Sequence, residues 1–203
     1  MFQGSGCERE ANHWKSQAED TPSMTSSKGD SLPKNLSSLS VLGSDETGTG
    51  DYFGPITVAA VYVPQDKIEL VKELGVKDSK MLSDEYMLKI APDLKATLPN
   101  CVLTLPNEQY NEVQKKGFSQ GKMKALLHNQ ALRKVLNEIE PERPAHVLID
   151  QFAERNTYYN YIKNEKEIVS ENVLFATKAE QIHVAVAAAS ILARCAFLHE
   201  MDK

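Results

Sequence analysis

The sequence predicts an α/β domain in which a mixed five-stranded sheet is flanked by helices. Three strand-like runs come first, a helical pattern and two more strand-like runs follow, and an apolar, alanine-rich helix comes last. The 203 residues are enough to bury about 70% of the surface of the unfolded chain, so the fold needs no disulfide or structural metal. No internal repeat is visible.

The first 38 residues differ from the rest in composition. They are rich in Ser, Glu, Lys and Asn and show neither a period of 2 nor one of 3.6. We predict that residues 1–38 are a disordered or non-native tail and that residues 39–203 form one domain.

Two strands joined by a glycine-rich turn open the domain. Residues 39–46 (LSVLGSDE) are a short apolar run that ends in paired acids. Residues 56–63 (ITVAAVYV) are rich in Val and Ile and lie between two prolines, which is typical of a strand. The segment TGTGDYFGP between them has the composition of a tight turn. Residues 101–105 (CVLTL) predict a third strand.

The remaining elements alternate between helix and strand. Ser83 precedes acids and is predicted to cap a helix. Residues 107–138 predict one amphipathic helix, because apolar residues recur at spacings of three and four. Residues 146–150 (HVLID) and 171–177 (ENVLFAT) predict two strands, and residues 179–198 predict a long buried helix.

Composition excludes several classes of protein. The three cysteines, Cys7, Cys101 and Cys195, are odd in number and far apart, which excludes a disulfide framework and a CxxC zinc site. No run of about 18 apolar residues predicts a membrane span, and no secretory signal opens the chain. We therefore expect a cytoplasmic protein that does not associate with a membrane.

Four acids border segments that are otherwise apolar. Asp45 and Glu46 are adjacent, so they point to opposite faces of a strand and share one site only where the strand ends or the turn bends it. Asp150 ends an apolar strand, at the sheet edge where α/β proteins bind ligands. Glu180 follows another apolar run and opens the last helix.

Carboxylates gathered at one sheet edge repel one another, and a divalent cation would remove that conflict. Oxygen ligands without histidine suit Mg²⁺ or Mn²⁺, and four carboxylates can hold two ions that hydrolyse a phosphodiester. Each feature also has a structural alternative. A DE pair at a strand end is commonly solvated, an acid in a first helical turn commonly complements the helix dipole, and GTG is commonly only a turn.

The net charge of −5 argues at face value against a nucleic-acid partner. Residues 41–203 hold 19 basic and 23 acidic side chains, an excess of four acids. The four acids above account for that excess, so the charge balance does not exclude nucleic acid.

Five blocks of sequence resemble ribonuclease HIII, a type 2 ribonuclease H. They are GSDETGTGDYFGP (43–55), VKDSKMLSD (76–84), MKALLHNQAL (123–132), HVLIDQFA (146–153) and TKAEQIHVAVAAASILAR (177–194). The resemblance covers residues 33–203 and implies a ribonuclease H-like fold. It also implies endonucleolytic cutting of the RNA strand of an RNA–DNA hybrid, with 3′-hydroxyl and 5′-phosphate ends.

The resemblance implies roles for the four acids. Asp45 would bridge two Mg²⁺ or Mn²⁺ ions, and Glu46 and Asp150 would each complete one ion's shell. Glu180 would position the attacking water or the second ion. Glutamate at this fourth position resembles the HIII branch, whereas the HII branch has aspartate there.

The resemblance also implies substrate contacts. Gly48, Thr49 and Gly50 match a loop whose backbone meets ribose 2′-hydroxyls, which glycine permits by allowing close approach. Lys80 and Asn129 match residues that contact the substrate backbone. A surface lysine and a polar residue on a helix face are the alternatives for these two.

The chain departs from the family pattern at both ends. Family members begin with a small basic domain and continue past the alanine-rich helix, so we predict a domain truncated at its C-terminus, with weakened substrate binding. We expect a monomer without an obligate protein partner. Two other functions stay open: a ribonuclease H-fold nuclease that cuts DNA, and a truncated hybrid-binding module with little turnover.

Overall fold

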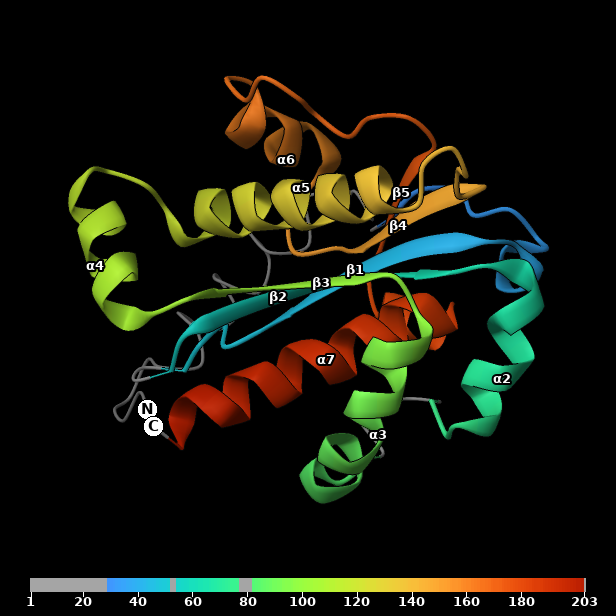
Figure 1. Ribbon diagram of the computed structural model, residues 1–203. Helices are drawn as coiled ribbons and strands as arrows, with labels where there is room; N and C mark the ends of the chain where they lie inside the picture. The colour runs from blue at the N-terminus through green and yellow to red at the C-terminus, as the bar shows by residue number, and fades with distance from the viewer. Residues whose placement is uncertain (1–28, 52–53, 77–81, 203) are drawn as a thin grey trace, which may run out of the picture.

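The computed structural model describes residues 29–51, 54–76 and 82–202, and these residues form a mixed sheet with helices on both faces (Figure 1). The strands are β1 (Val41–Thr47), β2 (Ile56–Val63), β3 (Asn100–Leu105), β4 (His146–Asp150) and β5 (Val173–Ala176). Their order in the sheet is β3-β2-β1-β4-β5. β1 is antiparallel to β2 and parallel to β4, so the predicted mixed five-stranded sheet is confirmed.

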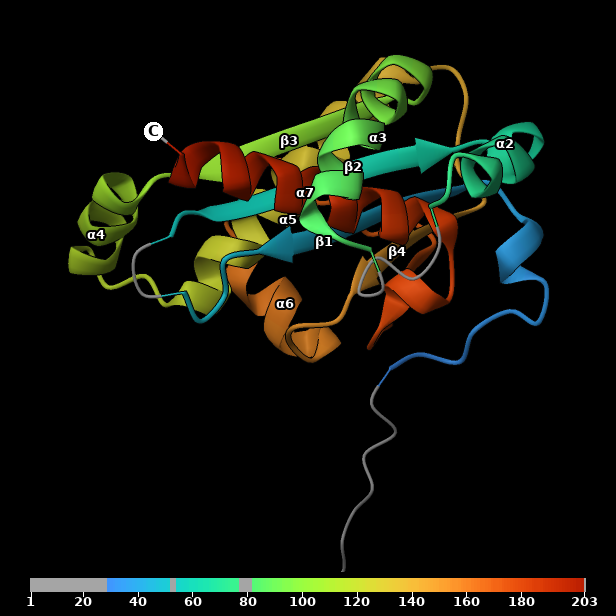
Figure 2. The ribbon, with the colours of Figure 1, turned by 90° about the horizontal axis from the view of Figure 1, so that it is seen from below.

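Helices cover the two faces of this sheet. They are α2 (Ile68–Glu73), α3 (Asp84–Thr97), α4 (Asn107–Lys115), α5 (Gln120–Glu138), α6 (Arg155–Ile162) and α7 (Val184–Met201). Within the described ranges, the 3-10 turns are η1 (Leu36–Ser38), η2 (Gln65–Lys67) and η4 (Ala179–Gln181). α5 and α6 lie on one face, whereas α7 and α3 lie on the other, where α7 runs across β1 and β2 (Figures 1 and 2).

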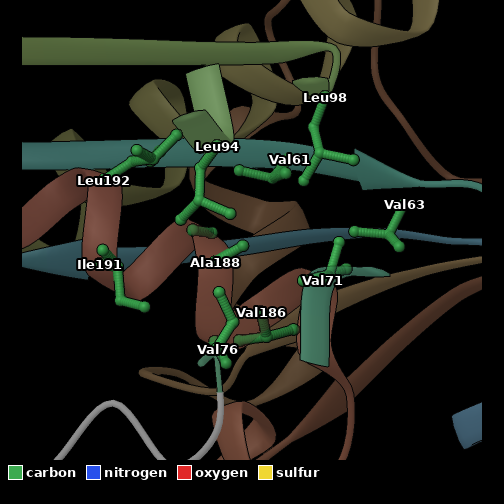
Figure 3. Close-up of a cluster of buried hydrophobic side chains, with 14 of the residues drawn as sticks. Val61, Val63, Val71, Val76, Leu94, Leu98, Val186, Ala188, Ile191 and Leu192 are labelled. Atoms are coloured by element: carbon green, nitrogen blue, oxygen red, sulfur yellow. The ribbon is translucent and has the colours of Figure 1, made fainter. Parts of the chain in front are cut away.

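Each face of the sheet has its own apolar core. On the α7 face, alternate residues of β2 such as Val61 and Val63 pack with Leu94 of α3 and Ile191 of α7 (Figure 3). α7 is long and apolar enough to cross a membrane by length and composition, and 56% of that stretch is buried inside the domain. Its apolar character is therefore accounted for by packing against the sheet.

A glycine lets α7 approach the sheet closely. A Cβ atom at Gly43 of β1 would lie 2.5 Å from the backbone nitrogen of Val186 and 2.6 Å from the carbonyl carbon of Ala185. No side chain fits between β1 and the first turn of α7. This contact sets the position of α7 relative to β1. Gly43 lies two residues before Asp45, the first predicted acid.

Two predicted helices have different bounds in the structure. The single helix expected over residues 107–138 is divided into α4 and α5, because Gly117 has a φ of +87° and Ser119 caps α5 by accepting the N–H of Lys122. The helix expected from residue 179 begins at Val184, because the extended residue His183 separates it from the turn η4.

The segment 29–38, which the sequence analysis assigned to the tail, packs against the domain. Leu36 is 2% exposed, and the Asp30 backbone N–H donates to the carbonyl oxygen of Phe175 on β5 at 2.8 Å. The Asp30 carboxylate accepts from the Phe175 N–H at 2.8 Å and from the Arg155 guanidinium at 2.5 and 3.3 Å. These ten residues are part of the domain, which corrects the boundary, and residues 1–28 lie outside the described residues.

Candidate functional site

Two of the predicted acids lie side by side at the carboxyl ends of neighbouring strands. The parallel register pairs Ser44 of β1 with Ile149 of β4, so Asp45 and Asp150 come next at the same edge. Asp45 is 7% exposed, and its pKa is raised to about 8, first by burial and then by the negative charges of Asp150 and Glu46. A hydrogen bond from Ser190 of α7 acts in the opposite direction. The structure therefore brings these two acids together.

Glu46 points to the other face of β1, as expected for adjacent strand residues. Its Oε1 accepts from Lys124 Nζ of α5 at 2.9 Å, and its Oε2 lies 3.0 Å from Nε2 of His128. Burial alone would raise the pKa of Glu46, but the hydrogen bond and charge of His128 and the ammonium of Lys124 bring that pKa below its ordinary value. Glu46 is therefore held ionised.

Asp150 is connected to the segment that carries the fourth acid. Its Oδ1 accepts the backbone N–H of Ala179 at 2.8 Å, in the turn that contains Glu180. Glu180 is 5% exposed and lines a cavity of about 610 Å³ together with Lys72 of α2 and His183. The structure thus links Asp150 to the Glu180 turn, while the Glu180 side chain borders a cavity shared with α2.

The residues at this edge suit a divalent cation, but they do not form a complete set of metal ligands. Within the described ranges, no group of three or more His, Cys, Asp or Glu side chains is arranged to hold a metal ion. Asp45 and Asp150 offer oxygen ligands close enough for the charge of Asp150 to raise the pKa of Asp45. Mg²⁺ or Mn²⁺ between them would remove that repulsion, so this pair fits the implied metal, and Glu46 already has Lys124 as a counter-charge.

The two glycines in the turn after β1, Gly48 and Gly50, have different surroundings. Gly48 has a φ of +100°, and a Cβ there would lie 2.0 Å from the carbonyl oxygen of Pro55, so the turn itself requires glycine. Gly50 has a φ of +95°, but a Cβ there would meet no atom within 4 Å. Thr49 between them is exposed. The backbone at Gly50 is therefore open to approach by a ligand.

A cavity of about 590 Å³ adjoins this turn. It is lined by Gly48, Gly50 and several neutral polar side chains of α4, among them Asn107, Asn111 and Gln114. Amide side chains both donate and accept hydrogen bonds. This cavity therefore suits a polar ligand beside the turn.

The two remaining predicted contacts have different outcomes. Asn129 is 1% exposed; its Nδ2 donates to the carbonyl oxygen of Glu167 at 2.9 Å, and its Oδ1 accepts the N–H of Val169 at 3.0 Å. Both ends of the Asn129 amide thus join α5 to residues 167–169, and the predicted substrate contact at Asn129 stays a prediction. Lys80 lies outside the described residues.

Several residues of the site were missed by the sequence analysis. Lys124 and His128 hold Glu46, Ser190 contacts Asp45, and Phe152 lies 5.0 Å from the His128 ring, measured between ring centroids. The available signal was a lysine and a histidine four residues apart within the buried stripe of a helix, where polar residues are uncommon.

A buried histidine beside the Glu180 turn gives a pH prediction. His183 Nδ1 accepts the N–H of Ala185 at 3.0 Å and so caps α7, while Nε2 donates to the carbonyl oxygen of Leu39 at 3.1 Å. This pairing requires the neutral ring, and burial lowers the pKa of His183 to about 4. The unfolded chain binds this proton near pH 6.5, so stability from this group is lost as the pH falls from 6.5 to 4.

We expect His183→Asn to remove this loss, because asparagine also caps helices but does not titrate. Relative to the original chain, the variant should gain about 3 kcal/mol of unfolding free energy between pH 7 and pH 4. Urea unfolding at several pH values measures it, with His199→Asn, an exposed histidine of α7, as the control. A difference that does not change with pH would contradict this assignment.

Comparisons with known proteins agree with the predicted fold and family. The sequence model of the family described as Ribonuclease HII matches residues 42–203. Ribonuclease HIII of Lysinibacillus sphaericus is 66% identical over 207 residues, covering 100% of this chain and 67% of the relative. Ribonuclease HIII of Bacillus licheniformis is 53% identical, covering 100% of this chain and 66% of the relative. The chain thus spans about two thirds of the length of these relatives, and the matched part includes residues 1–38.

Solved structures show the same relationship. Bst-RNase HIII in complex with Mn²⁺ matches with a TM-score of 0.81 and 47% identity, over 99% of this chain and 66% of that one. Aquifex aeolicus RNase H3, at 24% identity and a TM-score of 0.62, covers 100% of this chain and 66% of its own and shares the fold. The family match, the identities and the shared fold together confirm the predicted resemblance to ribonuclease HIII, and the chain belongs to the ribonuclease HII family.

Proposed function

We propose that this chain carries the catalytic domain of an endonuclease that hydrolyses the RNA strand of RNA–DNA hybrids. In this proposal it uses two Mg²⁺ or Mn²⁺ ions and leaves 5′-phosphate and 3′-hydroxyl ends. The observation that carries the proposal is the pair Asp45 and Asp150, which stand next to each other at one sheet edge, where the charge of Asp150 raises the pKa of Asp45. The names of the relatives and the Mn²⁺ complex of a similar structure support it.

The glycine turn supports recognition of RNA. The exposed backbone at Gly50 and the neutral amides of α4 border one cavity, next to the strand that carries Asp45. The ribose 2′-hydroxyl is neutral, donates and accepts hydrogen bonds, and distinguishes RNA from DNA. The backbone, the amide groups and the Asp51 carboxylate that line this cavity suit that hydroxyl better than they suit a phosphate.

Each acid would have its own role in metal binding and hydrolysis. Asp45 and Asp150 would hold the metal ions, and Asp45 would bind both. Glu46 would bind one of the ions, and Glu180 would position the second ion or the attacking water. Bound metal supplies Lewis-acid polarisation of the phosphate and a water of lowered pKa. The Ser190 hydroxyl orients the carboxylate of Asp45.

A hydrolysis assay on a hybrid with a labelled RNA strand tests the proposal. We expect cleavage in Mg²⁺ or Mn²⁺ and none in EDTA, with 5′-phosphate on the downstream product. Asp150→Asn should lower the rate at least about 100-fold, because it removes one metal-binding charge. Asp93→Asn, which removes an exposed carboxylate from α3, is the matched control. Activity that survives Asp150→Asn would overturn the assignment.

The same assay separates the alternatives. An all-DNA duplex cut as fast as the hybrid would favour a DNA nuclease of the same fold. Binding of the hybrid without turnover, even in Mn²⁺, would favour a hybrid-binding module. The chain covers about two thirds of its relatives, so binding and turnover are measured separately.

A further inference from the structure

Two side chains of α5 converge on one acid of the site. Lys124 and His128 are four residues apart and therefore lie on the same face of the helix. Lys124 binds Oε1 of Glu46 at 2.9 Å and His128 lies 3.0 Å from Oε2, so each oxygen has its own partner. Nδ1 of His128 lies 2.9 Å from the hydroxyl of Ser44, two residues before Glu46 on the same face of β1. We name Lys124 and His128 the α5 clamp.

The α5 clamp is buried, unlike an ordinary surface ion pair. Lys124 is 6% exposed and His128 and Ser44 are 0% exposed, and the side chain of Glu46 is 10% exposed. Lysine is almost never this buried unless a carboxylate pairs with it, because a buried ammonium loses its water. The charge of Lys124 is thus fixed in place beside the site.

Lys124 also contacts the other segments that form the site. Its Nζ donates to the hydroxyl of Thr49 in the glycine turn at 3.4 Å and lies 4.4 Å from the ring centroid of Phe152, two residues after Asp150. One ammonium therefore touches the end of β1, the turn after it and the segment after β4. Its position holds all three in a single arrangement.

We propose that Lys124 is a positioning residue that acts as a built-in cation of the acidic site and sets its affinity for divalent metal. The proposal rests on the proposed function of the same acids. The ammonium already neutralises Glu46, and its charge also repels an arriving cation across a buried region where screening is weak. Removing the charge of Lys124 leaves a more negative site, so the metal binds more tightly. The same change leaves the side chain of Glu46 less ordered.

Mn²⁺ binding to the full chain tests this inference without any substrate. Calorimetric titration should show Mn²⁺ bound about tenfold more tightly by Lys124→Met, which is similar in length but uncharged. Lys124→Arg keeps the charge and should restore the original affinity. Lys122→Met is the matched control, because Lys122 lies on the same helix and stacks on the Phe118 ring at 3.9 Å. It loses the same charge and should leave the affinity unchanged.

A second variant guards against loss of folding. Lys124→Gln keeps a hydrogen-bond donor for Glu46 and removes only the charge, so it should also bind Mn²⁺ more tightly. Folded variants with unchanged or weaker Mn²⁺ affinity would overturn the inference. Variants that stay unfolded both with and without Mn²⁺ would also overturn it, since Lys124 would then be structural only. Tighter Mn²⁺ binding in a chain that cleaves no hybrid would sustain the inference and reject the proposed function.

Discussion

Asp45→Asn is expected to abolish hydrolysis and to make the metal-free protein more stable. The rate on a labelled hybrid should fall at least about 100-fold, because the carboxylate that interacts with both Asp150 and Glu46 is lost. The stability should rise because a buried carboxylate beside two like charges becomes a neutral amide of the same shape.

The stability gain should depend on pH. The pKa of Asp45 is about 8 in the folded protein and 3.8 ordinarily, so between these values the folded chain binds a proton that the unfolded chain has lost. The original chain therefore loses stability from this group as the pH rises from about 4 to 8. The advantage of Asp45→Asn in EDTA should be small at pH 4 and on the order of 4 kcal/mol at pH 7.

Urea unfolding in EDTA across this pH range measures the gain, with Asp93→Asn as the variant that loses an exposed charge. A variant that is inactive but less stable than the original at pH 7 would show that Asp45 is not repelled by its neighbours. Added Mn²⁺ should reverse the order of stability, because only the original chain has both aspartates for the metal.

Gly43→Ala is expected to cause the largest loss of stability among single-methyl changes in this sheet. Its Cβ would lie 2.5 Å and 2.6 Å from backbone atoms of Val186 and Ala185, which cannot rotate away as a side chain could. We expect a loss of about 3 kcal/mol, typical of overpacking in a core. Activity should fall too, because Ser190, one turn further along α7, contacts Asp45.

Urea unfolding and the hybrid assay measure both effects. Gly121→Ala in α5 is the control, because the three atoms nearest to its Cβ would all belong to the movable side chain of Tyr161, from 3.1 Å, and alanine favours helix. A Gly43→Ala protein within about 0.5 kcal/mol of the original would mean that α7 does not lie so close to β1.

The parts of the fold that could be predicted are those with local signals. Prolines on either side of residues 56–63 delimit β2, and Ser83 caps α3 as expected. The short helices α2 and α6 were missed because neither carries a long apolar period. The break between α4 and α5 depends on Gly117 and Ser119, local signals that were passed over in favour of the apolar spacing that begins at Met123.

The residues of the site also divide into those that the sequence could predict and those that depend on tertiary structure. Asp45 and Asp150 could be placed from sequence because parallel strands bring their carboxyl ends to one edge. The ion pair of Glu46 with Lys124 could not, since it depends on how α5 crosses β1, a tertiary feature that no residue spacing specifies. The hydrogen bonds of Asn129 could not be predicted for the same reason, because its partners lie 38 and 40 residues further along the chain.

The segment that begins at Gly29 also covers part of the exposed edge of the sheet. β5 ends the sheet, and an open edge strand offers unpaired backbone groups to another chain. Here three outward groups of β5 have partners: Asp30 pairs with the N–H and the carbonyl oxygen of Phe175, and Arg155 donates to the carbonyl oxygen of Val173 at 2.6 Å. Asp30 and Arg155 thus occupy backbone groups that an additional strand would otherwise pair with, which limits the pairing of this edge with a neighbouring copy.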